Sequence, residues 1–418
     1  MIRAALLSTA ALLTAAAPAM AQDEAAARRI LERTPLIDGH NDLPWALRQA
    51  HGNDPHAVDL TVNLDASTDL HTDIPRLRAG GVGGQFWSVY VPSTMQGREA
   101  VRVTLEQIDI VHRMVRQWPQ TFALARTAAD VERIFKGGRI ASLIGMEGGH
   151  SIDNSLATLR MMHAVGAGYM TLTHSANVPW ADSATDKPVL GGLSKFGEEV
   201  VREMNWLGML VDLSHVSPDT MEDAIRVSEA PVIFSHSSAK AICNVPRNVP
   251  DNVLQMVPKN GGVVMITFVA PFVSKEVADT VRPAREEVRR RTRAIKDRAE
   301  RERIEDEVFA ALKVPPVTIA QVADHVEHVR KVAGVDHVGL GGDFDGNRLW
   351  PVGLGDVSTY PHLFAELIRR GWSDADLQKL AGQNVLRAFR KAEDVSKRLR
   401  ATRPPSAATL DALDRSDR

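Results

Sequence analysis

Short apolar runs alternate with longer amphipathic segments along this chain. Runs that are almost wholly apolar are typical of parallel strands whose two faces are both buried. Each run is followed by polar or Gly/Pro-containing residues and then by a segment of helical periodicity. Eight such units predict an α/β fold, a closed (β/α)8 barrel of the TIM type, in preference to an open sheet. The runs cover residues 36–38, 84–91, 140–145, 169–173, 209–213, 232–235, 262–268 and 338–342, and the helical segments include 156–165, 196–207, 218–227 and 319–332.

The turn after the first run separates the barrel from its main alternative. A doubly wound open sheet that binds a nucleotide carries a glycine-rich phosphate turn at this point. Here the turn reads Asp38-Gly39-His40-Asn41-Asp42, which offers imidazole and carboxylate groups instead. We therefore expect ligand chemistry at the carboxyl end of the first barrel strand.

Two segments fall outside the eight units. Residues 275–313 are crowded with Arg, Lys, Glu and Asp, and many opposite charges lie three or four positions apart. This spacing is typical of solvated helices with ion pairs along one side, so we expect a charged helical insertion before the last strand. The barrel domain then covers 22–398, and the polar tail 399–418 is expected to be poorly ordered.

The first residues have the pattern of a signal peptide. A short basic start, Met1-Ile2-Arg3, precedes an apolar run over 4–18, and Ala19-Met20-Ala21 fits a small-x-small cleavage site. Residues 1–21 are expected to be the signal peptide, with an uncleaved anchor as the alternative. The later sequence shows no integral membrane segment and no lipid-anchor signal, which predicts a periplasmic or secreted protein.

Charge and cysteine content exclude several classes of protein. The formal net charge is −2, so a strongly basic nucleic-acid binder is excluded and no nucleic-acid partner is expected. Cys243 is the only cysteine, so no disulfide can form within the chain. No catalytic pattern surrounds this thiol, which favours a small buried side chain over a nucleophile.

Six of the eight runs end in His, Asp or Glu. In a barrel these ends meet at one rim, where active sites are assembled. One such residue is weak evidence, but packing does not explain six strands that deliver them to one rim. Charged groups at a buried barrel mouth are costly unless they are paired or bind a metal, so the pattern predicts a metal centre. The residues are His40, Asp42, Glu147, His150, His174, Asp212, His215, His236, Asp343 and Asp345.

The kind and number of donors suggest which metal binds. Imidazole and carboxylate groups without thiolate suit zinc best, although Mn²⁺, Co²⁺ and Fe²⁺ stay open. Four of the donors together with one glutamate exceed the three protein ligands of a single catalytic zinc and suit two metals that share a carboxylate. Glu147 is the natural bridge because it has two oxygens and comes from a strand between the two ligand sets. The four donors are His40, Asp42, His215 and His236.

Eight motifs resemble those of the membrane dipeptidases (renal dipeptidase, peptidase family M19), which belong to the amidohydrolase-like superfamily. They follow the order of that family from about residue 35 to about residue 390. The sequence differs from the vertebrate members in the charged insertion and in lacking their anchor signal and framework cysteines. The motifs are IDGHNDLPW (37–45), EGGHSI (147–152), TLTHS (171–175), NVPWAD (177–182), VDLSHVS (211–217), FSHSS (234–238), RNVPD (247–251) and GGDFDG (341–346).

The resemblance implies a role for each site residue. His40 and Asp42 would bind one zinc ion, His215 and His236 the other, and Glu147 would bridge the two. His174 would contact the scissile carbonyl or its oxyanion. Arg247 would hold the terminal carboxylate of the substrate, with an ion pair to Asp251 as the alternative. Asp343 would handle protons.

The reaction that follows is zinc-dependent hydrolysis of dipeptides, with two Zn²⁺ per subunit. Dipeptides with a D-configured second residue are included as a hypothesis, and the resemblance to the family suggests a homodimer.

The nearest alternative is another amide or ester hydrolase of the same metal barrel, an N-acyl-amino-acid deacylase or a lactonase, whose metals are commonly bridged by a modified Lys. A periplasmic protein that binds metal and ligand without turnover is the alternative of another class. His150 and Asp345 are expected to support the site from behind, and Trp45 and Trp180 either line the pocket or pack in the core.

Overall fold

The computed structural model describes residues 21–65, 68–295 and 298–414. In this part of the chain all strands pair in parallel in one sheet, in the order β2-β1-β9-β8-β7-β6-β5-β4-β3, and a further pairing of β2 with β4 closes it. The closure confirms the eight-stranded barrel. Its strands are β1 (Leu36–Asn41), β2 (Val82–Tyr90), β4 (Ile140–Glu147), β5 (Ala167–Thr171), β6 (Leu210–Asp212), β7 (Ile233–Phe234), β8 (Val263–Ile266) and β9 (Val338–Leu340).

One strand outside the barrel was not predicted. β3 (Phe122–Leu124) pairs with residues 140–142 of β4. Because β2 already occupies one edge of β4, β3 shares the other edge with β5, which pairs with residues 144–147. Three residues are too few to show a period of two, which explains why the sequence pattern does not mark this strand.

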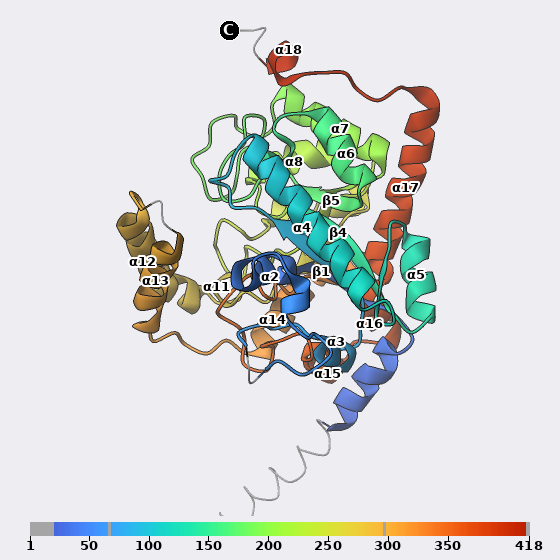
Figure 1. Ribbon diagram of the computed structural model, residues 1–418. Helices are drawn as coiled ribbons and strands as arrows, with labels where there is room; N and C mark the ends of the chain where they lie inside the picture. Colours follow the sequence, from blue (N-terminus) through green and yellow to red (C-terminus); the bar gives the residue numbers. More distant parts are fainter. Residues whose placement is uncertain (1–20, 66–67, 296–297, 415–418) are drawn as a thin grey trace, which may run out of the picture.

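Helices surround the barrel, as Figure 1 shows. Their starts carry signals that the sequence displays: Ser217 caps the helix that begins with Pro218, and Thr318 forms a capping box with Gln321. The helices of the barrel are α2 (Leu43–His51), α3 (Ile74–Ala79), α4 (Arg98–Gln117), α5 (Ala128–Lys136), α6 (Leu156–Ala164), α7 (Lys195–Leu207), α8 (Pro218–Val227), α9 (Asp251–Leu254), α10 (Val257–Asn260), α11 (Ala270–Val273), α14 (Ile319–Ala333), α15 (Tyr360–Arg369), α16 (Asp374–Gln378) and α17 (Asn384–Thr402).

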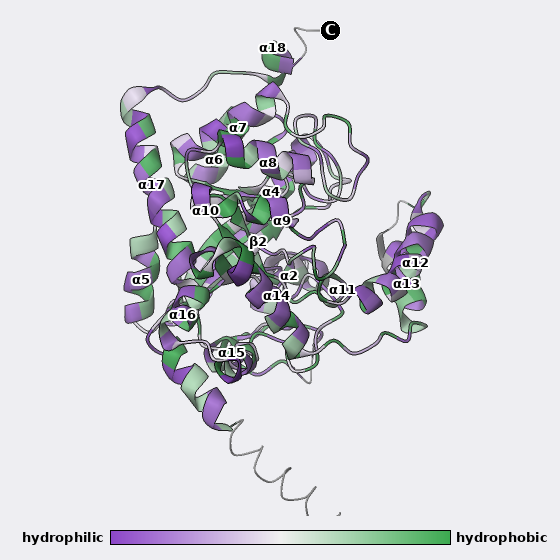
Figure 2. Ribbon diagram, turned by 180° about the vertical axis from the view of Figure 1, so that it is seen from behind, coloured by the Kyte–Doolittle hydropathy of each residue, from purple (hydrophilic) through white to green (hydrophobic). Residues whose placement is uncertain are grey.

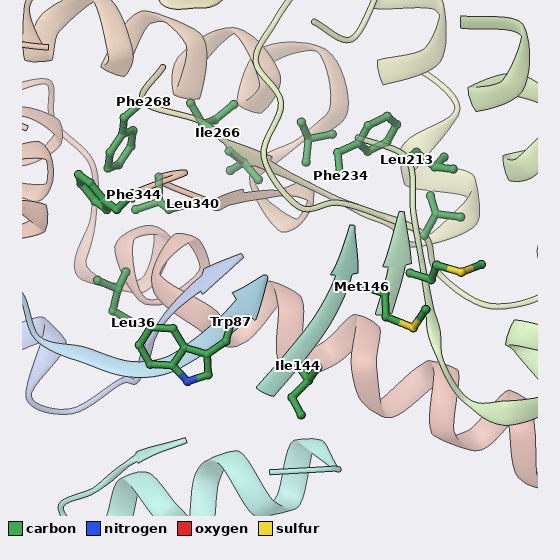
Figure 3. Packing of buried hydrophobic residues seen from close by; sticks show 14 of the residues in the cluster. Leu36, Trp87, Ile144, Met146, Leu213, Phe234, Ile266, Phe268, Leu340 and Phe344 are labelled. Atoms are coloured by element: carbon green, nitrogen blue, oxygen red, sulfur yellow. The ribbon is translucent and has the colours of Figure 1, made fainter. Parts of the chain in front are cut away.

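Both faces of the barrel strands are buried. Successive residues of one strand belong to two different hydrophobic clusters, as Ile233 and Phe234 of β7 and Met265 and Ile266 of β8 do. This alternation explains why the strands are apolar throughout instead of at every second position. Figure 3 shows part of the larger cluster, in which Phe268 and Phe344 have ring centres 5.8 Å apart. Burying each such side chain contributes about 1.5–3 kcal/mol.

The predicted charged insertion consists of two helices, α12 (Lys275–Thr292) and α13 (Arg298–Ala310). In Figure 1 they lie beside each other at one side of the barrel and are reached through α11, and Figure 2 shows α12 as largely hydrophilic. Ion pairs at spacings of three and four residues run along them, such as Arg290 with Glu287 and Arg303 with Glu300. The segment lies between β8 and α14, as expected.

The described part of the tail, residues 399–414, contains the end of one helix and a second, short helix. α17 continues to Thr402, and α18 (Leu410–Asp414) lies against α7. The Asp414 carboxylate accepts hydrogen bonds from the Ser194 hydroxyl and the backbone N–H of Phe196 at the start of α7. These contacts cap a helix that the barrel needs, and polar composition alone does not show them.

The predicted signal peptide, residues 1–21, lies outside the described residues except for its last position. Among the residues that the structure describes, no helix combines the length and the apolar composition that crossing a bilayer requires.

Candidate metal centre and active site

The polar ends of the strands converge at one rim of the barrel. His40 lies in β1 and Glu147 is the last residue of β4. Asp42 follows β1, and the other candidates follow the carboxyl ends of β5, β6, β7 and β9, so that the parallel, closed strands bring them to one rim. The prediction that these residues share one rim therefore agrees with the structure. The converging side chains are His40, Asp42, Glu147, His174, His215, His236 and Asp343.

One oxygen of Glu147 is the centre of this cluster. Its Oε1 lies 3.0 Å from His215 Nε2 and 3.5 Å from both His236 Nε2 and His40 Nε2. His174 Nε2 is 3.6 Å from the same oxygen. Four imidazoles from four different strand ends thus face one carboxylate that is only 4% exposed.

The donors form three overlapping groups, each suited to hold a cation: His40 with Glu147 and His236, Glu147 with His174 and His215, and His40 with Asp42 and Asp343. His215 Nε2 and His236 Nε2 lie 3.0 Å apart. Two nitrogens bound to one tetrahedral zinc at about 2.0–2.1 Å are separated by roughly 3.3 Å, so this spacing fits a shared ion. Glu147 and His40 each belong to two of the three groups, and of these two only the Glu147 carboxylate has a second oxygen to offer.

Hydrogen bonds behind two of the imidazoles fix which nitrogen faces the cluster. The Tyr169 hydroxyl donates to the Gly39 carbonyl, so it accepts from His40 Nδ1, 2.9 Å away. In the same way the Ser235 hydroxyl donates to Asp212 and accepts from His236 Nδ1 at 2.8 Å. Both Nε2 atoms therefore face Glu147, and the neutral His236 keeps a free lone pair there.

Three polar atoms of the cluster residues are buried and have no hydrogen-bond partner among the described residues: His40 Nε2, Asp42 Oδ1 and His215 Nδ1. Each polar atom that is buried without a partner costs about 1–3 kcal/mol of folding free energy, and binding a ligand removes this cost. Together with the grouping of the donors, these atoms indicate that the donor set fits a metal.

Burial and mutual interaction shift the pKa values of these groups. Burial, followed by repulsion from nearby cationic groups, holds the pKa of His236 and of His215 well below the usual value, so both imidazoles are neutral. Burial raises the pKa of Glu147, but the histidines outweigh it and hold the pKa well below its usual range. Burial, together with the charges of Asp42 and Glu147, raises the pKa of Asp343 well above its usual value. Burial and neighbouring charges thus move the pKa values of the Glu147 and Asp343 carboxyl groups in opposite directions.

The backbone is unusual at the same place. His215, Asp343 and Asp345 have φ values of 70°, 67° and 64°, in the left-handed region that side chains other than glycine seldom adopt. Gly346 closes the last of these turns, and a Cβ there would lie 2.1 Å from Asp42 Oδ2. Strained residues that gather around polar side chains indicate a functional site.

Arg247 lies beside the cluster without a counter-ion. It is 5% exposed, and among the described residues its guanidinium donates only two hydrogen bonds, both long at 3.4 Å, to Ser237 Oγ and to the His236 carbonyl. Within the described chain it forms no ion pair, and Asp251, its alternative partner, instead contacts His328 Nε2 at 2.8 Å. Burial lowers the pKa of Arg247 to about 10, so the side chain is still cationic at neutral pH.

A cavity of about 440 Å³ connects Arg247 with the donor cluster. Trp45 and Tyr90 line it, and the Tyr90 ring lies 4.9 Å from that of His174. Trp180 does not reach it: this side chain is fully buried and packs against Phe196. The cavity therefore holds donors for a cation, a cationic group for an anion, and aromatic walls.

Comparison with known proteins places this arrangement in a family. The family model of the membrane dipeptidases, peptidase family M19, matches residues 24–403. The chain belongs to this family. It is a metallo-dipeptidase, as the resemblance of its motifs predicted.

Solved structures of similar dipeptidases share the fold. The probable dipeptidase PvdM from Pseudomonas aeruginosa superposes with a TM-score of 0.74 at 24% identity, over 90% of this chain and 99% of that one. The dipeptidase AC, a metallopeptidase of family M19, gives 0.71 at 26% identity, over 86% and 98%. A metallopeptidase from Rhodobacter sphaeroides, solved with a phosphinate mimic of the dipeptide L-Ala-D-Ala, gives 0.71 at 25% identity, over 86% and 99%.

Some residues around the site of this M19 dipeptidase were not singled out from its sequence. Tyr169 and Ser235 orient the two imidazoles, and their only signal is their position in or beside a strand that delivers a histidine. His71 lies outside the motifs, and its backbone N–H donates to the Asp345 carboxylate at 2.7 Å. His150 supports the loop after β4, with Nε2 3.0 Å from the Val91 carbonyl, and burial lowers its pKa to about 4.

Proposed function

We propose that this metallo-dipeptidase hydrolyses dipeptides to free amino acids with two zinc ions in the described cluster. His40 and Asp42 would hold one ion, His215 and His236 the other, with Glu147 shared between them. The absence of thiolate donors and the number of nitrogen and oxygen donors support zinc and a count of two. When bound, the ions supply water of lowered pKa near neutral pH and a Lewis acid for the carbonyl.

The observation that carries the proposal is the buried, uncompensated Arg247 in the cavity beside the donor cluster. Its planar fork of N–H donors matches a carboxylate in two places at once. A dipeptide held there places its single peptide bond one residue away, toward the cluster. A longer peptide places a neutral amide at the guanidinium, which leaves the positive charge unpaired.

Two other side chains complete the proposed chemistry. His174 lines the cavity, and its Nε2 can donate to the oxygen of the scissile carbonyl as negative charge develops there. Asp343 lies with Oδ1 4.0 Å from His40 Nε2, and its raised pKa suits a carboxyl group that holds a proton and passes it to the leaving amine.

Stereochemistry, assembly and location extend the proposal. The Rhodobacter sphaeroides metallopeptidase was solved with a mimic of a dipeptide that ends in D-Ala, which supports acceptance of a D-configured second residue in this chain. The N-terminal sequence supports export to the periplasm or the medium. The proposal of a homodimer rests only on the membership of the chain in this family.

Metal analysis together with a dipeptide panel tests the proposal. We expect about two zinc equivalents per chain, loss of activity on chelation and recovery on adding zinc. The panel pairs L,L and L,D dipeptides with their C-terminal amides and with tripeptides. Full activity at one metal equivalent would contradict the two-ion centre, and equal turnover of dipeptide and amide would contradict the role of Arg247.

A further inference from the structure

The charged insertion forms part of the wall of the active-site cavity. Arg285 of α12 and Glu305 of α13 line it together with residues of the donor cluster. A second cavity of about 830 Å³ adjoins the first, and Arg247, Phe272, Arg285 and Glu305 line both. The insertion therefore contacts the space beyond Arg247, on the side away from the metal-binding donors.

Phe272 joins the two arginines of this shared wall. The guanidinium carbon of Arg247 lies 5.4 Å from the centre of the Phe272 ring, and that of Arg285 lies 5.8 Å from the same point. Two cations against one ring repel each other, and the ring quadrupole offsets only part of that repulsion. An anion bound between them removes the remainder.

Arg285 and Arg289 differ from the other arginines of α12, each of which forms an ion pair in the described residues. Arg282 pairs with Asp279, Arg290 with Glu287 and Arg291 with Glu307. In the described residues Arg285 has no such partner; its recorded contact is the Phe272 ring, although Glu305 lies close enough to interact electrostatically. Part of the residue stays exposed at the rim of the cavity, so its N–H groups are available to a ligand.

We propose that Arg285 determines specificity by binding a second carboxylate on the substrate, the side chain of a C-terminal Asp or Glu. The inference rests on the proposed role of Arg247, which would hold the α-carboxylate of the same residue. The two carboxylates of such a residue are joined by a short carbon chain, and the two guanidiniums lie against one ring. Arg285 thus adds a preference for dipeptides with an acidic C-terminal residue to the general dipeptidase activity.

The insertion offers a matched control for this residue. Arg289 lies one helical turn beyond Arg285 and lines only the outer cavity. Replacing either residue by alanine removes one positive charge from the same helix. Only the first replacement removes a charge that reaches the metal-binding cavity.

The test compares L-Ala-L-Asp with the uncharged, near-isosteric L-Ala-L-Asn. For the wild-type zinc enzyme we expect kcat/KM to be about five- to tenfold higher for the Asp substrate, between the effects of exposed and of buried charged contacts. Arg285→Ala should lower that ratio to about one with little change for the Asn substrate, whereas Arg289→Ala should keep it. Inhibition by non-hydrolysable phosphinate analogues of the two dipeptides should show the same ratios without turnover.

The possible results separate this inference from the proposed function. If both dipeptides are hydrolysed in preference to their amides but the Asp and Asn substrates react alike, Arg247 keeps its role and the role of Arg285 is overturned. A preference for Asp that survives Arg285→Ala, or that Arg289→Ala also abolishes, overturns it as well. Absence of dipeptide hydrolysis would reject the proposed function itself. A folding defect in Arg285→Ala would lower both rates and leave their ratio readable.

Discussion

At the barrel mouth, Glu147 has imidazoles from four other strand ends around it and is 4% exposed, whereas Glu287 on α12 pairs with Arg290 three residues further along the same exposed helix. Both regions are rich in charge. In the insertion several charges pair within one helix and stay in water, but at the mouth the partners come from distant parts of the chain and are taken out of water. The difference shows that burial decides whether a charged group needs a ligand.

The comparison also separates what each region contributes. Exposed pairs of the kind seen on α12 are worth about 0–1 kcal/mol and can be exchanged without consequence. Buried carboxylates and imidazoles are costly until they are paired or bind a cation, so their arrangement is retained for chemistry and not for stability. Mutations should therefore affect activity at the mouth and should have little effect on α12, apart from Arg285.

The largest effect is expected for Glu147→Gln. The change removes the negative charge that four imidazoles face, and with it the shared ligand of the proposed two-ion centre. We expect kcat/KM to fall more than about a thousandfold and the zinc content to drop below two equivalents. Metal analysis beside steady-state kinetics measures both.

Glu305→Gln is the matched control, since it removes a carboxylate from the same cavity but on the side of the insertion. It should keep both zinc equivalents. Near-normal kinetics of Glu147→Gln with unchanged metal content would make Glu147 a structural residue.

Asp343→Asn should separate proton transfer from metal binding. Burial and neighbouring carboxylates hold the pKa of Asp343 well above its usual value, and the amide cannot exchange a proton. We expect kcat to fall about 10²- to 10⁴-fold while the zinc content is unchanged. If the variant loses an ion instead, Asp343 is a metal ligand. Its carboxylate lies close enough to His40 and Asp42 to share a cation with them.

Arg247→Ala should have a smaller effect, confined to substrate selection. A charged hydrogen bond to the substrate carboxylate contributes roughly 1.5–3 kcal/mol, which is about ten- to a hundredfold in kcat/KM. Wild type should prefer a dipeptide to its C-terminal amide by that factor, and the variant should lose the preference with both ions retained. The comparison of the two substrates in the two proteins is the measurement; an undiminished preference in the variant would contradict the assignment.

The sequence predicted the parts of the molecule whose information is local. Continuous apolar runs identified the eight barrel strands because each is buried on both faces, and the strand ends identified the donors because a barrel brings them together. The supporting contacts of Tyr169 and Ser235 could not be predicted, since they depend on which side chain lies behind each imidazole. Arg285 was hidden for the same reason: among the arginines of α12, only its place in the fold distinguishes it.

The smallest effect is expected for an ion pair inside the insertion. Arg291 of α12 and Glu307 of α13 are joined by two hydrogen bonds of 3.0 and 3.1 Å, but both side chains are open to solvent. Replacing both by alanine should leave dipeptidase activity unchanged and should move the midpoint of thermal unfolding by no more than about 1 °C, since water and salt screen such pairs.

Arg160→Ala is the contrasting variant in the barrel. Arg160 pairs at 2.8 Å with Glu203, which is fully buried and also accepts from the backbone of Ser406 in the tail. Removing this arginine leaves a buried carboxylate without its cation and should cost about 2 kcal/mol of stability. If the two variants unfold at the same temperature, the burial of an ion pair does not determine how much its loss destabilises the protein, and our comparison of the two regions is wrong.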